Sequence, residues 1–588
     1  VVRPMIITER VWIAALLPEP TLWVNGEQYR MVYNVQTTRY LPGKLIQEYN
    51  DENLNFTTEL CYLTSRSVAI RSIVKNMSQK PVKVSFDWNG GVYEPTSVVS
   101  SIDKGLSFIR PKDSTNTVIR FLTADKIQAV GSDSLHVTEK SEMTLEPGKT
   151  YQSEMTQTLT LRGEDTAKEL AAIATLNIDN CFELNEQQWN AQIASLLSGN
   201  SKYLKDNKYR KVLVKAMMTL NSNYRTPAGD ILHGGSNPSY NGFINGIWSW
   251  DSWKIASGNV HFNEEIAKSE MITLFDYQAD NGMVPDFISY NKKYNNWRDA
   301  KPPVAAWGAM NVYKATGDKK FLETMFDKLY KFHQWWYAER DHNHNGICEY
   351  GSTDGTLIAA CWESGMDNGV RFDDAVMQKN SEKAWSMNQE NICLNSFLYV
   401  DKTILAEMAT LLNKPELAAQ LNAEAKVIKE FVQTKMWDKE TGFFYDTRID
   451  TGEHIKVMGA ECWLPLWAGI ATPEQAKQVM QKMMDPQKFN STLPLGTLDI
   501  SHPRLRPVRG YWRGPVWVDQ VYFGITGLRN YGFDREADIL TEKFINNAQG
   551  LTTDGPIHEN YNPLTGEALN SPNFGWSSAC IIKMLLDE

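Results

Sequence analysis

The hydrophobic pattern changes its period once along the chain. Up to about residue 165 apolar residues alternate with polar ones, as between Val82 and Phe86, and Asn89-Gly90 follows as a hairpin signal. Alternation with a period of two is typical of strands that bury one face, so we predict an antiparallel β-sandwich domain over 1–165. The pattern over 166–205 turns helical and predicts a helical linker.

Beyond residue 206 the period is that of helices. The segment Lys319–Arg340 carries apolar residues at intervals of three and four, which is one buried stripe of an amphipathic helix. Two more stripes flank the helix-breaking residues Asn413-Lys414-Pro415, as in an αα-hairpin. We predict that 206–588 forms one domain of paired helices, whose longer loops carry the function.

Composition and charge exclude several classes of protein. The chain has 588 residues, and one core rarely grows past roughly 250–300, so at least two domains are expected. The net charge of −10 argues against a nucleic-acid partner, and no apolar run reaches the ~20 residues of a membrane span. Seven scattered cysteines without a C-x-x-C pair predict neither a disulfide framework nor a zinc site. Because the chain begins with Val1 rather than Met, we expect upstream processing or truncation, which permits a periplasmic or exported location as well as a cytoplasmic one.

Two loops place carboxylic acids in unusual surroundings. The segment Trp362–Asn368 holds Glu363 and Asp367 around a Ser-Gly turn, and the segment 554–563 holds Glu559 between Gly and Pro residues. Hydrolysis of a glycosidic bond needs one protonated carboxyl to protonate the leaving oxygen and one carboxylate to activate water. Acidic loop residues are usually solvated surface charges or helix caps, so spacing alone does not establish a catalytic pair.

The distribution of tryptophan favours a sugar-binding site. Only four of the 19 tryptophans precede residue 200, and later ones alternate with polar residues, above all in the segment Trp248–Trp253. Aromatic rings cover the apolar faces of a sugar, while charged and amide groups bind its hydroxyls. Trp335, Trp336 and Trp467 lack such polar neighbours and are expected to be core residues.

A further loop carries the pattern D-x-N-x-N-G, the first half of an EF-hand-like calcium loop. Its ligand oxygens would come, in order, from Asp341, Asn343, Asn345 and the main-chain carbonyl of Ile347. The twelfth position is Ser352, which cannot supply the usual bidentate carboxylate, so an acid from elsewhere is needed. Without one, an Asn-rich turn after a helix explains the pattern as well as calcium does.

Together these loops resemble glycoside hydrolase family 63. The matching segments are WSWDSW (248–253), WESGMDN (362–368), YWRGPVWVDQ (511–520) and DGPIHENYNPLTG (554–566). The resemblance implies a β-sandwich followed by an all-α (α/α)6 toroid barrel over 206–588. It also implies an inverting, exo-acting α-glucosidase that hydrolyses short oligosaccharides, with Asp367 as general acid and Glu559 as general base.

The resemblance extends to the surroundings of the two acids. With the tryptophans of the polar loops, the expected substrate-binding residues are Trp250, Asp251, Trp297, Lys301, Glu363, Trp512, Arg513 and Trp517. Bacterial members carry calcium at the matching loop, and Glu390 occupies the position of their completing carboxylate. We therefore expect structural Ca²⁺ and no organic cofactor. Close bacterial members also carry a long insertion between this loop and the acid, whereas only a short segment separates Tyr350 from Trp362 here, which leaves linkage preference open.

Two alternative functions stay open. A trehalase-like or glucoamylase-like hydrolase would use the same barrel, and activity on trehalose against kojibiose or nigerose would separate these enzymes from an α-glucosidase. A non-catalytic carbohydrate-binding protein would use the same aromatic loops, although both catalytic carboxylates are present. The expected partner is an oligosaccharide in each case, with no nucleic acid and no membrane span, and the sequence does not indicate an oligomeric state.

Overall fold

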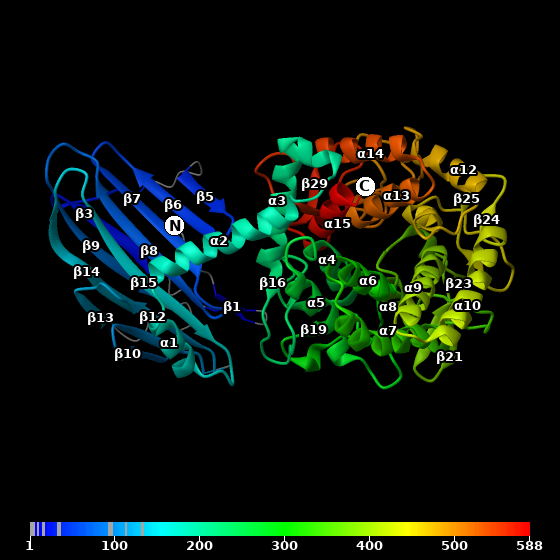
Figure 1. Ribbon diagram of the computed structural model, residues 1–588, viewed down its shortest axis with the longest axis horizontal. Coiled ribbons are helices and arrows are strands. Elements are labelled where there is room, and N and C mark those ends of the chain that lie inside the picture. Colours follow the sequence, from blue (N-terminus) through cyan, green and yellow to red (C-terminus); the bar gives the residue numbers. More distant parts are fainter. Residues whose placement is uncertain are drawn as a thin grey trace. The chain divides into compact units, whose positions relative to one another are not determined.

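The computed structural model describes residues 6–8, 11–13, 18–31, 37–91, 98–111, 114–130 and 134–587. The chain separates into two compact units, Val1–Ala194 and Ser195–Glu588 (Figure 1). The first is built mainly from strands and the second mainly from helices, as the change of hydrophobic period predicts. Within the described ranges, no helix combines the length and apolar character that crossing a bilayer requires.

The first unit contains two large antiparallel sheets. One has the strand order β10-β11-β12-β15-β8-β7-β6-β5 and the other the order β13-β14-β9-β3-β4. The strands of this unit are β1 (Ile6–Thr8), β2 (Val11–Ile13), β3 (Glu19–Val24), β4 (Glu27–Gln28), β5 (Thr38–Leu41), β6 (Lys44–Asn50), β7 (Leu54–Tyr62), β8 (Ser67–Asn76), β9 (Val82–Gly91), β10 (Val98–Ile102), β11 (Gly105–Ile109), β12 (Asn116–Phe121), β13 (Lys126–Val130), β14 (Ser134–Leu145) and β15 (Thr150–Thr160). Both sheets contribute to one buried core, for example through Phe56 of β7 and Phe86 of β9.

Strand β9 shows both the strength and the limit of the local pattern. Val82, Val84 and Phe86 are buried in the core, as their alternation with polar residues predicts. The hairpin predicted at Asn89-Gly90 is wrong, because β9 continues to Gly91 and pairs both residues with β14. A long ladder of tertiary hydrogen bonds therefore overrides the local turn preference.

Helices dominate the rest of the chain. They are α1 (Thr166–Ala174), α2 (Ile178–Leu196), α3 (Asn207–Asn223), α4 (Ser249–Asn259), α5 (Glu264–Thr273), α6 (Ala305–Thr316), α7 (Lys319–Glu339), α8 (Leu357–Glu363), α9 (Ile392–Leu411), α10 (Pro415–Thr434), α11 (Leu464–Trp467), α12 (Pro473–Met483), α13 (Val518–Asn530), α14 (Asp534–Asn547) and α15 (Gly575–Leu586). Helix α7 buries the predicted apolar stripe, including Leu322, Leu329 and Trp336. Helices α9 and α10 form the predicted αα-hairpin, with Asn413 in the left-handed conformation between them.

Six helices of the second unit contact one another in succession. Helix α4 contacts α6, α6 contacts α9, α9 contacts α11, α11 contacts α13, α13 contacts α15, and α15 contacts α4. Outside this set, α3 packs on α4 and α15, α5 on α4 and α6, α7 on α6 and α9, α10 on α9, and α14 on α13. These contacts are nonlocal, so hydrophobic periodicity predicts the helices but not their pairing.

Short strands precede several of these six helices. The short strands are β16 (Tyr224–Arg225), β17 (Gly235–Ser236), β18 (Gly246–Trp248), β19 (Phe287–Ser289), β20 (Gly351–Ser352), β21 (Met377–Ser381), β22 (Ala384–Met387), β23 (Gln389–Glu390), β24 (Trp437–Asp438), β25 (Phe443–Phe444), β26 (Thr447–Arg448), β27 (Val516–Trp517), β28 (His558–Tyr561) and β29 (Ala568–Pro572). The first turns of three helices meet through indole rings, since Trp576 of α15 lies 5.0 Å from Trp250 of α4 and 5.5 Å from Trp517, the N-cap of α13. The beginnings of these helices therefore surround a common site.

Candidate active site

The loop that carries Asp367 turns over an indole ring. Gly365 follows α8 with a φ of +69°, and a Cβ atom at this position would come within 2.3 Å of the Trp250 ring. Only glycine fits both the left-handed conformation and the close approach. The turn therefore brings the acid loop against Trp250 in the first turn of α4, which also contains the predicted residue Asp251.

A second segment clamps the same loop from the other side. Asn368, the residue after Asp367, donates to the carbonyl of Gly510 at 3.1 Å and accepts from the main-chain N–H of Trp512 at 3.0 Å. Arg513 donates to the carbonyl of Asn368 at 2.9 Å and forms an ion pair with Asp373. The predicted residue Arg513 is thus occupied in holding the acid loop in place.

The predicted base, Glu559, lies in strand β28 between β27 and β29. Its side chain is 2 % exposed and accepts from the N–H of Ser571 at 3.2 Å and from the hydroxyl of Tyr511 at 3.3 Å. The Lys215 ammonium of α3 donates to four main-chain carbonyls of the preceding loop, those of Gly550, Leu551, Thr553 and Gly555. Charge-assisted hydrogen bonds therefore fix the loop that leads to Glu559.

Burial raises the pKa of both predicted catalytic acids. Burial raises the pKa of Asp367 to about 6, with Lys301 lowering it and Asp286 raising it further. Burial raises the pKa of Glu559 to about 7, hydrogen bonds from Ser571 and Tyr511 lower it, and the charge of Asp367 raises it. The carboxyls therefore interact, and between about pH 6 and 7 the pair holds one proton. A pair that holds one proton can supply one acid and one base, but the higher pKa of Glu559 places most of that proton on Glu559. The form with Asp367 protonated and Glu559 ionised, which the predicted roles require, is therefore the minor singly protonated form.

A buried lysine and further carboxylates surround Asp367. The ammonium of the predicted residue Lys301 lies 3.3 Å from Asp286 and 3.7 Å from Asp299, and it donates to the carbonyl of Trp362. Burial raises the pKa of Asp251 to about 7, which Lys254 and Lys301 partly offset. The sequence did not single out Asp286 and Asp299, although both lie in the loop that also contains Trp297 and Lys301.

Four nearly buried indole rings form a continuous cluster, which we call the aromatic wall. The wall consists of Trp250, Trp512, Trp517 and Trp576. Trp512 and Trp517 stack with centroids 3.9 Å apart and an interplanar angle of 7°. The buried ammonium of Lys254 lies 3.3 Å from the centroid of Trp250 and 3.2 Å from that of Trp576, and it pairs with Asp519 at 2.9 Å. Three of the four tryptophans were predicted for the site, and Trp576 was not.

Two predicted substrate-binding residues lie away from this wall. Glu363 is fully buried, and its oxygens accept from Arg340 at 2.7 and 2.8 Å, from Gly351 N–H at 2.6 Å and from Ala300 N–H at 3.2 Å. Because every acceptor position faces a protein donor, Glu363 holds Arg340 and the main chain at Ala300 and Gly351, and its contact with substrate stays a prediction. Trp297 is 37 % exposed and its carbonyl accepts from Thr353, so this residue lies on an outer loop.

The predicted calcium loop folds around its own first residue. Asp341 accepts from the N–H groups of Asn345 and Gly346 at 3.0 and 2.9 Å, and Gly346 adopts a φ of +82°. Glu390 reaches the loop, since it accepts from the Asn345 amide and from the Thr447 hydroxyl, both at 2.8 Å. The structure therefore brings the predicted residues Asp341, Asn345 and Glu390 together.

Glu349 is a further acid at this loop that the sequence motif did not indicate. It is fully buried, its Oε2 accepts from His342 N–H at 3.0 Å, and its Oε1 has no hydrogen-bond partner. Counted from Asp341 it stands at the ninth position, which EF-hand loops use for coordination, so the spacing could have revealed it. Among the described residues, no three His, Cys, Asp or Glu side chains group so as to hold a metal, so amide and main-chain oxygens would have to contribute.

Residues 245–577 match the family model described as "Mannosylglycerate hydrolase MGH1-like glycoside hydrolase domain". A mannosylglycerate hydrolase of Rubrobacter radiotolerans is 27% identical over 416 residues, which cover 58% of this chain and 90% of the relative. A glucosylglycerate hydrolase of Mycolicibacterium hassiacum is 23% identical over 421 residues, covering 58% of this chain and 91% of the relative.

Solved structures show the same helical fold. A family 63 mannosylglycerate hydrolase from Thermus thermophilus, solved with glucose, aligns with a TM-score of 0.52 at 25% identity and covers 63% of this chain and 99% of its own. Part of this chain therefore has no counterpart in that enzyme. The family model spans more than half of the chain and includes Asp367, Glu559 and the aromatic wall. The chain thus belongs to the mannosylglycerate hydrolase MGH1-like members of glycoside hydrolase family 63.

Proposed function

We propose that this glycoside hydrolase cleaves a small α-glycoside of mannose or glucose with inversion, using Asp367 as general acid and Glu559 as general base. The observation that supports this most strongly is the pair of interacting carboxyls beside one aromatic wall, with Glu559 buried and Asp367 partly accessible. Asp367 would protonate the glycosidic oxygen, while Glu559 would take a proton from the attacking water on the opposite face of the sugar. The hydroxyl of Tyr511 stays protonated, because burial and the charge of Glu559 raise its pKa, and it holds the base in place.

We also infer that the helices of the second unit close into an (α/α)6 toroid, the finer architecture expected from the sequence motifs. The unbroken succession of contacts from α4 through α15 and back to α4 supports this inference. In such a ring the inner helices begin at one end. The acids and the aromatic wall would then face a single opening.

The aglycone that we propose carries a carboxylate, as glycerate does. Relatives from two bacteria are a mannosylglycerate hydrolase and a glucosylglycerate hydrolase by name. In this chain the segment before Trp512 is basic: Arg504 pairs with Asp373, whereas Arg506 and Arg509 are exposed and form no ion pair within the described part of the chain. Exposed arginines near the acid loop would attract and bind a carboxylate.

A second candidate is the exo-acting α-glucosidase of short neutral oligosaccharides that the motifs led us to expect. The cytosolic neutral trehalase of Saccharomyces cerevisiae is 23% identical over 356 residues, covering 50% of this chain and 46% of the relative. This relationship favours glucose in the cleaved position, without an acidic aglycone. The same relationship keeps trehalase-like activity among the activities to be tested.

An NMR time course on a substrate panel tests these proposals. The panel contains α-mannosylglycerate, α-glucosylglycerate, trehalose, kojibiose and nigerose. We expect hydrolysis of a glycerate glycoside, with the β-anomer of the sugar appearing before mutarotation. Release of the α-anomer would contradict inversion, and hydrolysis of the neutral disaccharides alone would contradict an acidic aglycone. No product from any member would favour a carbohydrate-binding protein.

The pH dependence follows from the two raised pKa values. Below about pH 6 both carboxyls hold protons and no base remains, and above about pH 7 both are ionised and no acid remains. We therefore expect a bell-shaped profile of kcat/KM with its maximum between these values. Initial rates with the best substrate from pH 4 to 9 measure it. A profile without an alkaline limb would contradict a protonated carboxyl as the acid.

We propose further that Ca²⁺ binds the loop 341–349 and stabilises the fold. Asp341, Asn343, Asn345, the carbonyl of Ile347 and Glu390 would hold it, and the unpartnered Oε1 of Glu349 supports a cation at this position. The ion would neutralise neighbouring buried carboxylates and join the loop to β23, which contains Glu390.

Chelation is therefore expected to lower the melting temperature by several degrees. A ligand present at 100 times its Kd stabilises a fold by about 2.7 kcal/mol, and Ca²⁺ should restore the loss. Differential scanning calorimetry with EDTA and then CaCl₂ measures the effect. The double variant Asp341→Asn/Glu390→Gln should respond to neither reagent. A native protein that also ignores both reagents would show that the loop binds no calcium.

A further inference from the structure

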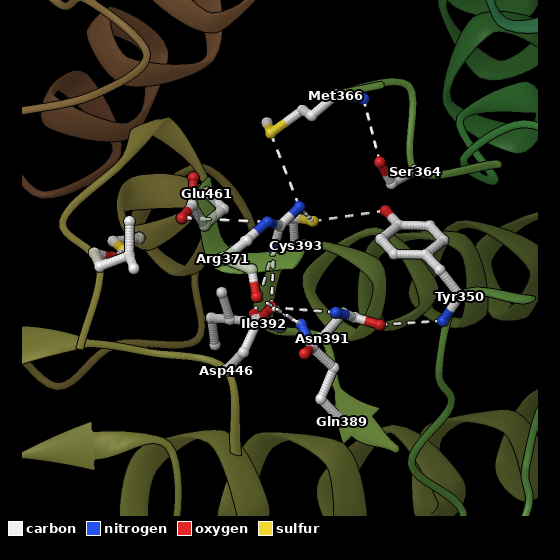
Figure 2. Close-up of polar contacts among 12 residues, drawn as sticks. Tyr350, Ser364, Met366, Arg371, Gln389, Asn391, Ile392, Cys393, Asp446 and Glu461 are labelled. Carbon is white, nitrogen blue, oxygen red and sulfur yellow. Dashed lines mark hydrogen bonds and ion pairs between the residues drawn. The ribbon is translucent and has the colours of Figure 1, made fainter. Parts of the chain in front are cut away.

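A buried arginine lies behind the acid loop. Arg371 follows Asp367 by four residues, in a short 3-10 helix over Val370–Phe372, and its side chain is 2 % exposed. One end of its guanidinium donates to both oxygens of Asp446, at 3.2 and 3.1 Å (Figure 2). The other end donates to Met366 Sδ at 3.6 Å and to Cys393 Sγ at 3.1 Å. Met366 immediately precedes the proposed acid.

Asp446 connects this arginine to the beginning of helix α9. It also accepts from the N–H of Ile392 at 2.8 Å, from the Asn391 amide at 2.9 Å and from the Gln389 amide at 3.2 Å. The pairing of β23 with β26 holds the surrounding main chain. These hydrogen bonds fix Asp446 to the beginning of helix α9. Asp446 in turn holds the Arg371 guanidinium in one orientation.

The remaining sides of the guanidinium are also enclosed. Glu461 lies 3.9 Å from Nε, which has no hydrogen-bond partner, and the ring of Phe372 lies 4.5 Å below the guanidinium carbon. Burying the Arg371 guanidinium costs desolvation free energy, and its two sulfur partners offset little of this cost because thioether and thiol sulfur are weak acceptors. The arrangement gives the guanidinium one orientation, and that orientation meets the residue next to Asp367.

We propose that Arg371, oriented by Asp446, is a positioning residue that sets the carboxyl of Asp367 against the leaving oxygen through its contact with Met366. This inference rests on the proposed role of Asp367 as general acid. A displacement of about 1 Å at a reacting group can cost roughly 10²-fold in rate, so a contact one residue away suffices for a large effect.

The test separates protonation of the leaving group from all other functions of the pocket. A glycerate or alkyl leaving group needs a proton from the acid when its bond to carbon breaks. Fluoride leaves as an anion without one, while the same water attacks and the same sugar is bound. The panel sugar is therefore supplied both as its glycerate glycoside and as its α-glycosyl fluoride.

We expect Arg371→Met to lower kcat on the glycoside by about 10²-fold with KM changed by less than about threefold. Hydrolysis of the fluoride should fall far less. Asp367→Asn should show the same selectivity with a larger loss on the glycoside. Arg448→Met is the matched control, because Arg448 donates to Asn388 and Gln389 in the same ladder without contacting the acid loop, and it should change neither substrate.

Two further variants keep the test decisive if Arg371→Met does not fold. Met366→Leu removes only the sulfur acceptor, and Arg371→Lys keeps the charge beside Asp446; both should lose activity selectively on the glycoside. Equal losses on both substrates, or a rise in KM alone, would overturn the inference and leave Arg371 a support of the fold. If Asp367→Asn itself fails to spare the fluoride, the proposed acid is wrong, and that outcome is distinct from failure of Arg371 alone.

Discussion

Asp367→Asn and Glu559→Gln are each expected to lower kcat on the hydrolysed glycoside by about 10²–10⁴-fold, the usual contribution of a general acid or base. Asparagine cannot donate the proton that the leaving oxygen needs, and glutamine cannot accept one from water. Steady-state kinetics on purified variants measure the loss. KM should change little, because neither substitution alters the aromatic wall.

The same two variants should fold as well as the native protein. Burial raises the pKa of both carboxyls, so a neutral amide removes a charge that the fold disfavours. Melting temperatures should therefore stay equal or rise. Asp374→Asn and Glu567→Gln are matched controls, because both acids are exposed and follow Asp367 and Glu559 by only seven and eight residues. Turnover close to the native value in Asp367→Asn or Glu559→Gln would remove that residue from its proposed role.

The parts of the fold that were predictable from sequence are local ones. The stripe on α7 and the hairpin of α9 and α10 follow from spacing within about 20 residues, which periodicity detects. The contact between α15 and α4 joins residues more than 300 apart, and no local pattern contains it. The barrel that brings these two helices together was expected from the long motifs that resemble family 63, and not from the period of the helices.

The candidate active site also divides into residues that local sequence identifies and residues that only the fold brings together. Asp367 and Glu559 stand in compact segments whose Gly and Pro residues mark unusual turns, so their sequence surroundings identify them. Asp286 and Asp299 share a loop with the predicted residues Trp297 and Lys301, yet their contacts with Lys301, and that of Trp576 with Trp517, required the fold. Tyr511 lies within a matching motif, yet its hydrogen bond to Glu559 required the fold.

Glu363 shows how a turn can separate two acids that are close in the sequence. It precedes Asp367 by four residues, and the turn at Gly365 directs the two side chains to different surroundings. Glu363 closes helix α8 with both oxygens on protein donors, whereas Asp367 is partly accessible. One acid is therefore expected to stabilise the loop, and the other to act on substrate.

Glu363→Gln is accordingly expected to destabilise the helical unit by about 3–5 kcal/mol, the usual cost of leaving a buried charge without its partner. Arg340 and Glu363 have fully buried side chains, so water cannot replace the lost carboxylate. The melting transition of the helical unit, followed by differential scanning calorimetry, should fall by roughly 4–6 °C. Glu407→Gln is the control, because its pair with Lys314 is exposed at both ends and should contribute less than about 1 kcal/mol.

The double variant Arg340→Met/Glu363→Leu distinguishes the lost ion pair from a lost substrate contact. If the cost comes from the uncompensated guanidinium, removing both charges should recover part of the stability that Glu363→Gln loses, because apolar side chains tolerate burial. Activity should recover with stability, since the acid loop regains its support. A substrate contact predicts the reverse: Glu363→Gln would raise KM with an unchanged melting temperature, and the second substitution would restore nothing. The changes in melting temperature and KM from the single to the double variant therefore decide whether Glu363 supports the fold or contacts the sugar.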